Sequence, residues 1–358
     1  MTQEHARKTD PGSKRARRAS RCLAKTAAVL GALICAGAAA TLQAATGDDP
    51  TPAYRPGGLL PSEVGPALAY RSEGVETCAA LSGSESLRAG QAGTGPTIRV
   101  LKILTRSPTA RAIMESAAVT RVRGLPLHVC LDRETDLLAY YFSGLGVIGL
   151  NAALSEGGRV AFLAHEIAHV PQHPRYSDNR YYPPEDLLLL RRVREATAEA
   201  IAVRITWELR AAGYAQAWNE KASGPYADVA RAFEVLARRG GGEAGLLAAT
   251  RAAFDRWFAA AWRRDAYDRM TVDHLRRISG DHLGLVPPRR RLGAYFLRGI
   301  ARVNGRNFLS ETEGPPLNDP LYAGRVSSEN AVTLRQVLQD AQAMSPAGRA
   351  DPMDGAAY

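Results

Sequence analysis

The chain has 358 residues, of which 46% are hydrophobic and 23% are charged, a composition typical of a globular protein that can bury a core around a site. Its formal net charge of +10 invites a nucleic-acid-binding interpretation, but residues 1–25 hold eight basic residues against two acidic ones and so supply six of those charges. No later stretch alternates basic and aromatic residues as a single-strand groove requires. The sequence therefore predicts no nucleic-acid partner.

The first 45 residues are expected to export the chain. The basic lead is followed by a nearly uninterrupted apolar stretch, residues 26–45, and then by a polar stretch rich in turn residues. This order is typical of a cleavable signal peptide, and the apolar stretch is also nearly long enough to remain as a membrane anchor. Both alternatives stay open. In either case the basic flank places the rest of the chain in the periplasm or cell envelope.

Residues 46–96 are rich in Gly, Pro, Ser and Thr, which predicts a linker or poorly ordered lead. The folded domain is expected over residues 97–345, followed by a disordered tail, residues 346–358. Of the four cysteines, only Cys78 and Cys130 fall after the export segment. They could form a disulfide in an oxidising compartment, or Cys130 could be a buried free thiol in its apolar run.

The start of the expected domain has the patterns of strands around one helix. Residues 97–104, TIRVLKIL, predict a strand, and Ser107-Pro108 predicts the start of a helix that ends near Val119. LPLHVCLD, residues 125–132, predicts a second strand. AYYFSGLGVIGLNAAL, residues 139–154, predicts a hairpin with a glycine-rich turn.

The remainder of the domain has helical periodicity. Ser155 can cap a helix that Pro171 ends, and a second long helix is predicted from Pro184 to about Ala212, before Gly213. Further helices are predicted over residues 226–239, 243–278 and 328–344.

The helix that begins after Ser155 contains the HExxH pattern, His165-Glu166-Ile167-Ala168-His169. Residues four apart lie on one face of a helix, so the two imidazoles can converge on one metal ion. Glu166 points about a hundred degrees around the helix, beside the metal and outside its ligands. That is where a base must lie to take a proton from zinc-bound water.

A catalytic zinc ion needs a third protein ligand and an open fourth position. Glu195, inside the second long helix, is the candidate, and Glu199 one turn later could orient a ligand histidine by a hydrogen bond. Glu195 could instead be a solvated residue of the RRVRE charge run. The rival third ligand is His173, four residues after His169, although Pro171 interrupts the helix between them.

HEIAH followed by REATAE resembles the gluzincin group of zinc metallopeptidases, in which HExxH precedes a helix that bears a ligating Glu and a second carboxylate one turn later. The upstream strands, especially VIGLNAAL, are similar to those of a bacterial metallopeptidase domain family of unknown substrate. The resemblance covers about residues 97–213, and gluzincins carry Asp more often than Glu at the last position. It implies five site residues: the zinc ligands His165, His169 and Glu195, the general base Glu166 and the orienting carboxylate Glu199.

The sequence thus predicts an α+β, zincin-like fold, with a small twisted sheet packed on the HExxH helix and a mostly helical C-terminal half. The expected function is Zn²⁺-dependent hydrolysis of a peptide or protein substrate. Residues 147–154 could offer backbone groups to an extended peptide, and Tyr176, Tyr181 or Tyr182 could reach the site. Two other hypotheses remain: a non-catalytic envelope protein with a structural metal site, and a binding protein without metal.

Overall fold

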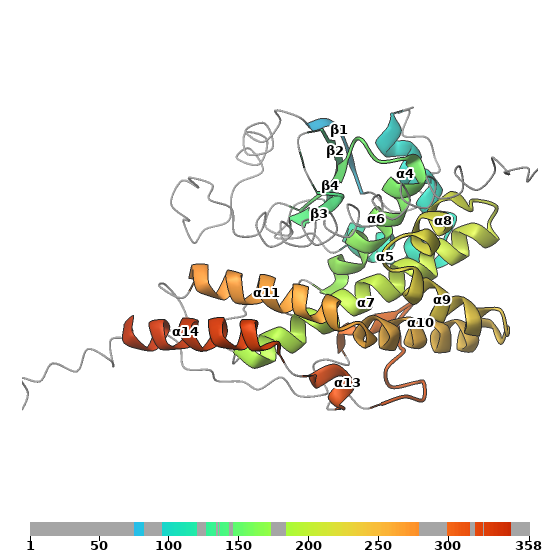
Figure 1. Cartoon of the computed structure of the whole chain (residues 1–358). Helices are drawn as coiled ribbons and strands as arrows, with labels where there is room; N and C mark the ends of the chain where they lie inside the picture. Colours follow the sequence, from blue (N-terminus) through green and yellow to red (C-terminus); the bar gives the residue numbers. More distant parts are fainter. Residues whose placement is uncertain are drawn as a thin grey trace, which may run out of the picture.

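The computed structural model describes residues 75–81, 95–119, 127–133, 135, 137–142, 146–172, 184–278, 299–315, 319–324 and 326–344 (Figure 1). The expected export segment, residues 1–45, and the expected tail, residues 346–358, lie outside these ranges. Within them the fold is a mixture of helices and strands, mostly helical, with a small four-stranded sheet and a two-stranded one. The predicted mixed, mostly helical fold with a small sheet is therefore confirmed.

The larger sheet has the strand order β1-β2-β4-β3. Its strands are β1 (Val75–Ala80), β2 (His128–Asp132), β3 (Ala139–Phe142) and β4 (Val147–Asn151). β2 and β4 are parallel, whereas β1 pairs with β2 and β3 pairs with β4 in antiparallel fashion. The antiparallel strand pairing of the predicted hairpin is confirmed, and its turn residues 143–145 lie outside the described residues. β4, however, lies inside the sheet between β2 and β3, so its backbone groups pair with those neighbours.

Two predictions for the start of the domain are wrong. Residues 97–104 are not a strand but most of helix α4 (Pro96–Leu104), whose buried residues include Thr97, Val100, Leu101 and Leu104. Those positions have helical spacing, and a proline in the first turn favours a helix start. Strand β1 lies within residues 46–96, where a linker was expected, so ordered structure begins before Thr97.

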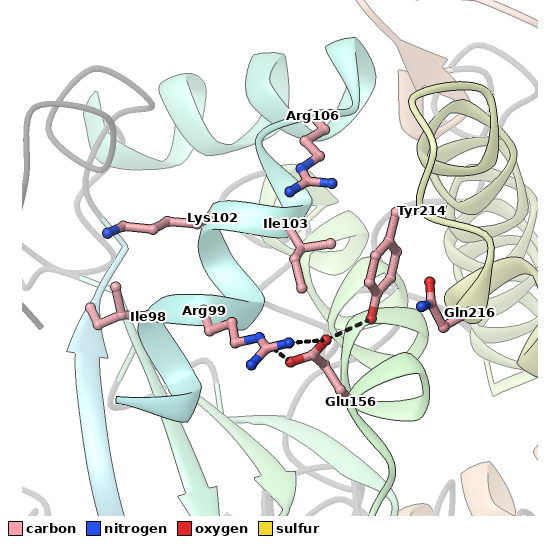
Figure 2. A pocket seen from close by; sticks show the side chains of 8 residues that line it. All are labelled: Ile98, Arg99, Lys102, Ile103, Arg106, Glu156, Tyr214 and Gln216. Carbon is pink, nitrogen blue, oxygen red and sulfur yellow. Dashed lines mark hydrogen bonds and ion pairs between the residues drawn. The ribbon is translucent and has the colours of Figure 1, made fainter. Parts of the chain in front are cut away.

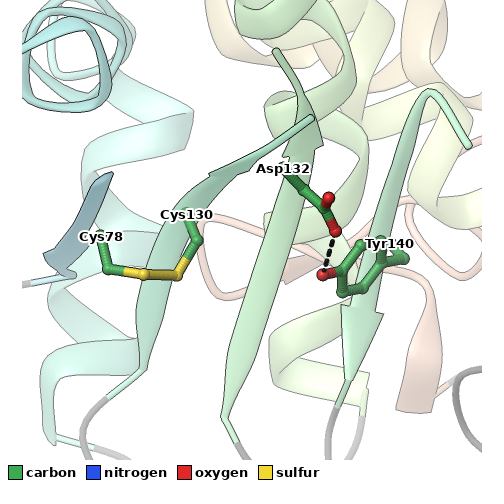
Figure 3. The surroundings of a disulfide bond; sticks show 4 residues. All are labelled: Cys78, Cys130, Asp132 and Tyr140. Atoms are coloured by element: carbon green, nitrogen blue, oxygen red, sulfur yellow. Dashed lines mark hydrogen bonds between the residues drawn. A yellow bond between two sulfur atoms is a disulfide. The ribbon is translucent and has the colours of Figure 1, made fainter. Parts of the chain in front are cut away.

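A disulfide between Cys78 and Cys130 joins β1 to β2 (Figure 3). The two cysteines are directly opposite each other in the strand register. Of the two alternatives for Cys130, the structure has the disulfide rather than the free thiol. In the chain-entropy account, closing a loop across 52 residues contributes about 4 kcal/mol to stability.

The other predicted helices are close to those of the structure, except that the helix expected over residues 243–278 is two helices, separated at Ala260, which is extended. The helices Gln216–Ser223 and Pro320–Ala323 and the short strands Arg302–Val303 and Arg306–Asn307 were not predicted. The helices are α5 (Pro108–Val119), α6 (Glu156–His169), the 3₁₀ turn η1 (Val170–Gln172), α7 (Pro184–Ala211), α8 (Gln216–Ser223), α9 (Ala227–Ala237), α10 (Gly242–Ala259), α11 (Ala261–Ile278), α13 (Pro320–Ala323) and α14 (Ser328–Met344). The short strands β5 (Arg302–Val303) and β6 (Arg306–Asn307) form the second sheet.

Helix α7 is the centre of the helical part. Its 28 residues span about 42 Å, and it packs against α6, α8, α9, α10 and α11. Buried alanines such as Ala196, Ala198 and Ala200 let these helices approach closely. α6 lies between the sheet and α7, and Figure 1 shows the strands above and beside α6 and the helices α7, α10 and α14 below it. This layering brings one face of α6 against α7.

No helix among the described residues is both long and apolar enough to span a membrane.

Candidate metal centre

The end of α6 carries the two histidines of the HExxH pattern. The helix begins at a capped terminus, where the Ser155 hydroxyl accepts a hydrogen bond from the Gly158 backbone N–H at 2.9 Å. His165 and His169 lie one turn apart near the opposite end, and their Nε2 atoms are 3.2 Å from each other. The helical spacing therefore makes the two imidazoles converge, as the sequence predicts.

Glu195 reaches the same point from α7. Its Oε2 lies 3.5 Å from His165 Nε2 and 3.6 Å from His169 Nε2, and the residue is only 3% exposed. Candidate ligand atoms of these three residues all lie within 4.8 Å of one another. The structure thus brings together the three side chains that the sequence proposes as metal ligands, and Glu195 is not a solvated residue of a charge run.

The far nitrogen of each imidazole has an acceptor. His165 Nδ1 lies 2.9 Å from Glu199 Oε2, and His169 Nδ1 lies 3.0 Å from Gln172 Oε1. The Gln172 amide donates through Nε2 to the Arg194 carbonyl, which orients its oxygen toward His169. A carboxylate oxygen and an amide oxygen can only accept a hydrogen bond, so each Nδ1 is the donor and carries a proton. The Nε2 lone pair of each neutral imidazole then points into the site.

These donor atoms fit a small divalent cation. Two Nε2 lone pairs and a carboxylate oxygen facing one another repel unless a positive charge lies among them. Tetrahedral ligands at zinc distances are separated by roughly 3.3–3.5 Å. The separations here are 3.2, 3.5 and 3.6 Å, so the group matches that geometry without rearrangement.

The charges around His165 favour a cation in this place. Burial would lower the pKa of His165, but the hydrogen bonds with Glu195 and Glu199, and the charges of Glu199 and Glu166, raise that pKa to about 9. In the metal-free protein His165 is therefore protonated at neutral pH, and the added proton lies on the Nε2 atom that faces the site. A metal ion must displace it, since the ligand nitrogen has to be deprotonated.

Each carboxylate from α7 is held ionised by its own cation. Burial opposes ionisation of Glu195, but the charge of Arg191, whose Nη2 is 2.9 Å from Oε1, and the nearby histidines hold the Glu195 pKa well below its usual range. Burial likewise opposes ionisation of Glu199, but Lys221 from α8 and His165 bring its pKa down to about 2. Lys221 Nζ donates to both Glu199 oxygens at 2.8 Å.

Glu166 has the surroundings of a proton acceptor. It is 5% exposed, and its Oε2 has no hydrogen-bond partner among the described residues. Burial raises the pKa of Glu166, against the charges of His165 and His169. A carboxylate with an unoccupied oxygen beside a metal group can accept a proton from a bound water.

Three polar residues of this centre were not predicted from the sequence: Gln172, Arg191 and Lys221. Gln172 is three residues after His169 and Arg191 four before Glu195, so local spacing offered a signal for both. Lys221 lies on another helix and had none. The rival ligand His173 and the loop tyrosines Tyr176, Tyr181 and Tyr182 lie outside the described residues.

The segment predicted to bind extended peptide, residues 147–154, is misplaced for that role. β4 is an inner strand, and its hydrogen-bonding edges are paired with β2 and β3. Among the described strands, β3 is the sheet edge on the side of β4, and it packs against α6. An added strand on the side of the sheet edge that packs against α6 would therefore pair with β3, not with β4.

A cavity of about 520 Å³ lies at the other end of α6, beside Glu156 (Figure 2). Arg99 of α4 forms an ion pair with Glu156 at 2.5 Å, and the Tyr214 hydroxyl donates to the same carboxylate at 3.4 Å. Glu156 is nine residues before His165, about 14 Å along the helix. This cavity is therefore separate from the metal group.

Residues 71–306, more than half of the chain, match the family described as "Putative metallopeptidase family (DUF6782)". The chain belongs to this family. The match contains all of α6 and α7, and hence every residue of the metal group. No curated protein and no solved structure matches the chain. Family membership implies a bound metal ion, and His165, His169 and Glu195 are the group that suits one.

Proposed function

We propose that the protein is a zinc-dependent peptidase with a zincin-like fold, in which His165, His169 and Glu195 bind the metal. Membership of a metallopeptidase family supports the hydrolase class. The observation that carries the proposal is the convergence of three donor atoms from two helices, at separations that suit a tetrahedral ion. Two imidazoles and one carboxylate form a donor set found in catalytic zinc sites. A carboxylate from α7 as third ligand, followed by Glu199, supports the gluzincin arrangement.

Glu166 is the general base of this proposal. When bound, zinc lowers the pKa of its water and polarises the substrate carbonyl. Glu166 Oε2, buried and without a partner among the described residues, accepts the water proton and later delivers it to the leaving amine. Glu199 and Gln172 hold the two imidazoles in the orientation that ligation needs.

The substrate is a peptide that pairs with the edge of β3. This strand packs against α6 and is antiparallel to β4, so an extended chain beside it would pass along the HExxH helix. The ring of Tyr140 holds β3 to the sheet, because its hydroxyl donates to Asp132 Oδ2 at 3.0 Å (Figure 3). Backbone pairing of this kind binds many sequences, with side-chain pockets adding preference.

A structural metal site in a non-catalytic envelope protein is the alternative. Structural zinc sites normally fill all four positions with protein ligands. Among the described residues, no fourth His, Cys, Asp or Glu joins His165, His169 and Glu195. This favours a site with an open position.

We further propose that the protein is exported through residues 1–45, as a cleaved signal peptide or a single anchor. The Cys78–Cys130 disulfide supports an oxidising compartment, because such bonds are rare in a reducing cytosol.

The test compares metal content and peptidase activity of wild type, Glu166→Gln and Glu195→Ala, on an unstructured protein such as casein. We expect one zinc per wild-type chain, zinc retained in Glu166→Gln with activity lower by about 10²- to 10⁴-fold, and zinc depleted in Glu195→Ala. A Glu166→Gln variant as active as wild type, or a zinc-loaded wild type that cleaves nothing, would contradict the proposal.

A further inference from the structure

The two oxygens of Glu195 have different partners. Oε2 faces the imidazoles, 3.5 Å from His165 Nε2 and 3.6 Å from His169 Nε2. Oε1 faces the other way and lies 2.9 Å from Arg191 Nη2, one turn earlier on α7. The carboxylate is thus divided between a metal group on one side and a guanidinium on the other.

We propose that Arg191 is a positioning residue that keeps Glu195 a one-oxygen metal ligand and leaves a coordination position free for water. A carboxylate can bind a cation through one oxygen or both. If both oxygens of Glu195 turned to the ion, they would take the place that a catalytic site reserves for water. Attraction between Arg191 and Oε1 opposes that rotation. This inference rests on the proposed metal site, but it concerns coordination and needs no peptidase activity.

Burial makes the Arg191–Glu195 contact stronger than an ordinary helix-surface pair. Exposed pairs at this spacing are worth about 0.3–0.5 kcal/mol. Here the Glu195 side chain is 4% exposed and that of Arg191 is 17% exposed, so solvent screens the pair much less. The guanidinium carbon also lies 5.9 Å from the centre of the Tyr267 ring on α11, which holds Arg191 from a second helix.

No other cation among the described residues is placed to do this. Lys221 uses its ammonium on both oxygens of Glu199. Arg192, the next residue on α7, is bound to Asp268 on α11. Arg191 is accordingly the only basic side chain of the described residues in ion-pair contact with Glu195, apart from the histidines of the metal group.

The test measures zinc affinity by chelator competition and the visible spectrum of the Co²⁺-loaded protein, without substrate. Arg191→Met removes the charge and keeps a long side chain, and Arg191→Lys keeps a point charge. The matched control is Arg210→Met, the same substitution on the same helix, where Arg210 pairs with Glu234. We expect Arg191→Met to let both Glu195 oxygens reach the ion, so the Co²⁺ absorption bands should weaken as they do when a tetrahedral ion gains a ligand, while zinc affinity equals or exceeds that of wild type. Arg191→Lys should restore most of the wild-type spectrum, and Arg210→Met should match wild type.

The proposal is overturned if Arg191→Met gives the wild-type Co²⁺ spectrum or binds zinc more weakly than wild type, or if Arg210→Met changes the spectrum equally. Should Arg191→Met not fold, Arg191→Gln, which keeps a donor but no charge, is judged by the same two measurements. A wild type that binds zinc but cleaves no peptide would contradict the proposed function alone. The role of Arg191 would still be decided by affinity and spectrum.

Discussion

Replacing Lys221 by Met removes the cation behind Glu199. Lys221 is 7% exposed, Glu199 is 2% exposed, and the ammonium donates at 2.8 Å to each carboxylate oxygen. Met retains the length and most of the apolar stem of Lys221 and removes the donors and the charge, which lies 5.7 Å from the centre of the Phe162 ring. The substitution therefore isolates the electrostatic part of the Lys221–Glu199 pair.

The expected loss follows from the pKa of Glu199. Burial raises it, but the charge of Lys221 and the hydrogen bond from His165 lower it from 4.5 to about 2. At 1.36 kcal/mol per pKa unit, a shift of this size corresponds to about 3 kcal/mol, and removing one partner of a buried pair costs about 3–5 kcal/mol. At neutral pH the metal-free His165 is still protonated, since its pKa is about 9, and it continues to compensate Glu199. We therefore expect a loss of about 3 kcal/mol for Lys221→Met.

The pH dependence of this loss has a definite sign. Because the folded-state pKa of Glu199 is lowered, the stabilisation is fully present above the ordinary value of 4.5 and is lost as the pH falls toward 2. The difference in free energy of unfolding between wild type and Lys221→Met should therefore narrow between pH 5 and pH 3.

Urea unfolding of the metal-free proteins, in chelator, measures this difference at pH 7 and pH 3. Lys102→Met is the matched control, since Lys102 is exposed on α4, and it should change stability by no more than about 0.5 kcal/mol. Two results would refute the reasoning: a loss below about 1 kcal/mol for Lys221→Met at pH 7, or a loss that stays the same at pH 3.

Three further predictions concern other parts of the molecule. Zinc must displace a proton from His165, whose pKa is about 9. The apparent zinc affinity should therefore rise about tenfold for each unit of pH between pH 6.5 and 9 and stay constant above pH 9 as far as His165 is concerned. An affinity that does not change with pH in chelator competition would contradict this. Replacing Cys78 and Cys130 together by Ser should cost about 4 kcal/mol of unfolding free energy, and reducing the wild type should cost as much; a much smaller loss in urea unfolding would contradict it. Gly149→Ala places a Cβ 2.2 Å from the Tyr140 ring, so it should cost about 1–3 kcal/mol, whereas Tyr140→Ala together with Gly149→Ala should cost no more than Tyr140→Ala alone.

Sheet order and the nature of α4 show where sequence patterns were insufficient. The segment 97–104 has only eight residues and is largely apolar, and such a short apolar segment is compatible with either a strand or a helix. In the structure, the buried positions of α4 have helical spacing. β4 was correctly predicted as a strand, but the insertion of β4 between β2 and β3 depends on long-range pairing that its own residues do not encode. The position of β3 at the edge of the sheet, among the described strands, followed only from that pairing.

The sequence by itself determined that His165 and His169 share one face of a helix and that Glu166 lies beside them. A helix has 3.6 residues per turn, so residues four apart lie on one face wherever the helix lies in the fold. The sequence also indicated Glu195, through helix periodicity and resemblance. Only the tertiary structure decided that α7 lies against α6, so that Glu195 meets the histidines, and that Lys221 of α8 lies behind Glu199. Contacts between helices depend on how whole helix faces pack. A residue that acts through such a contact therefore cannot be identified from the sequence around it.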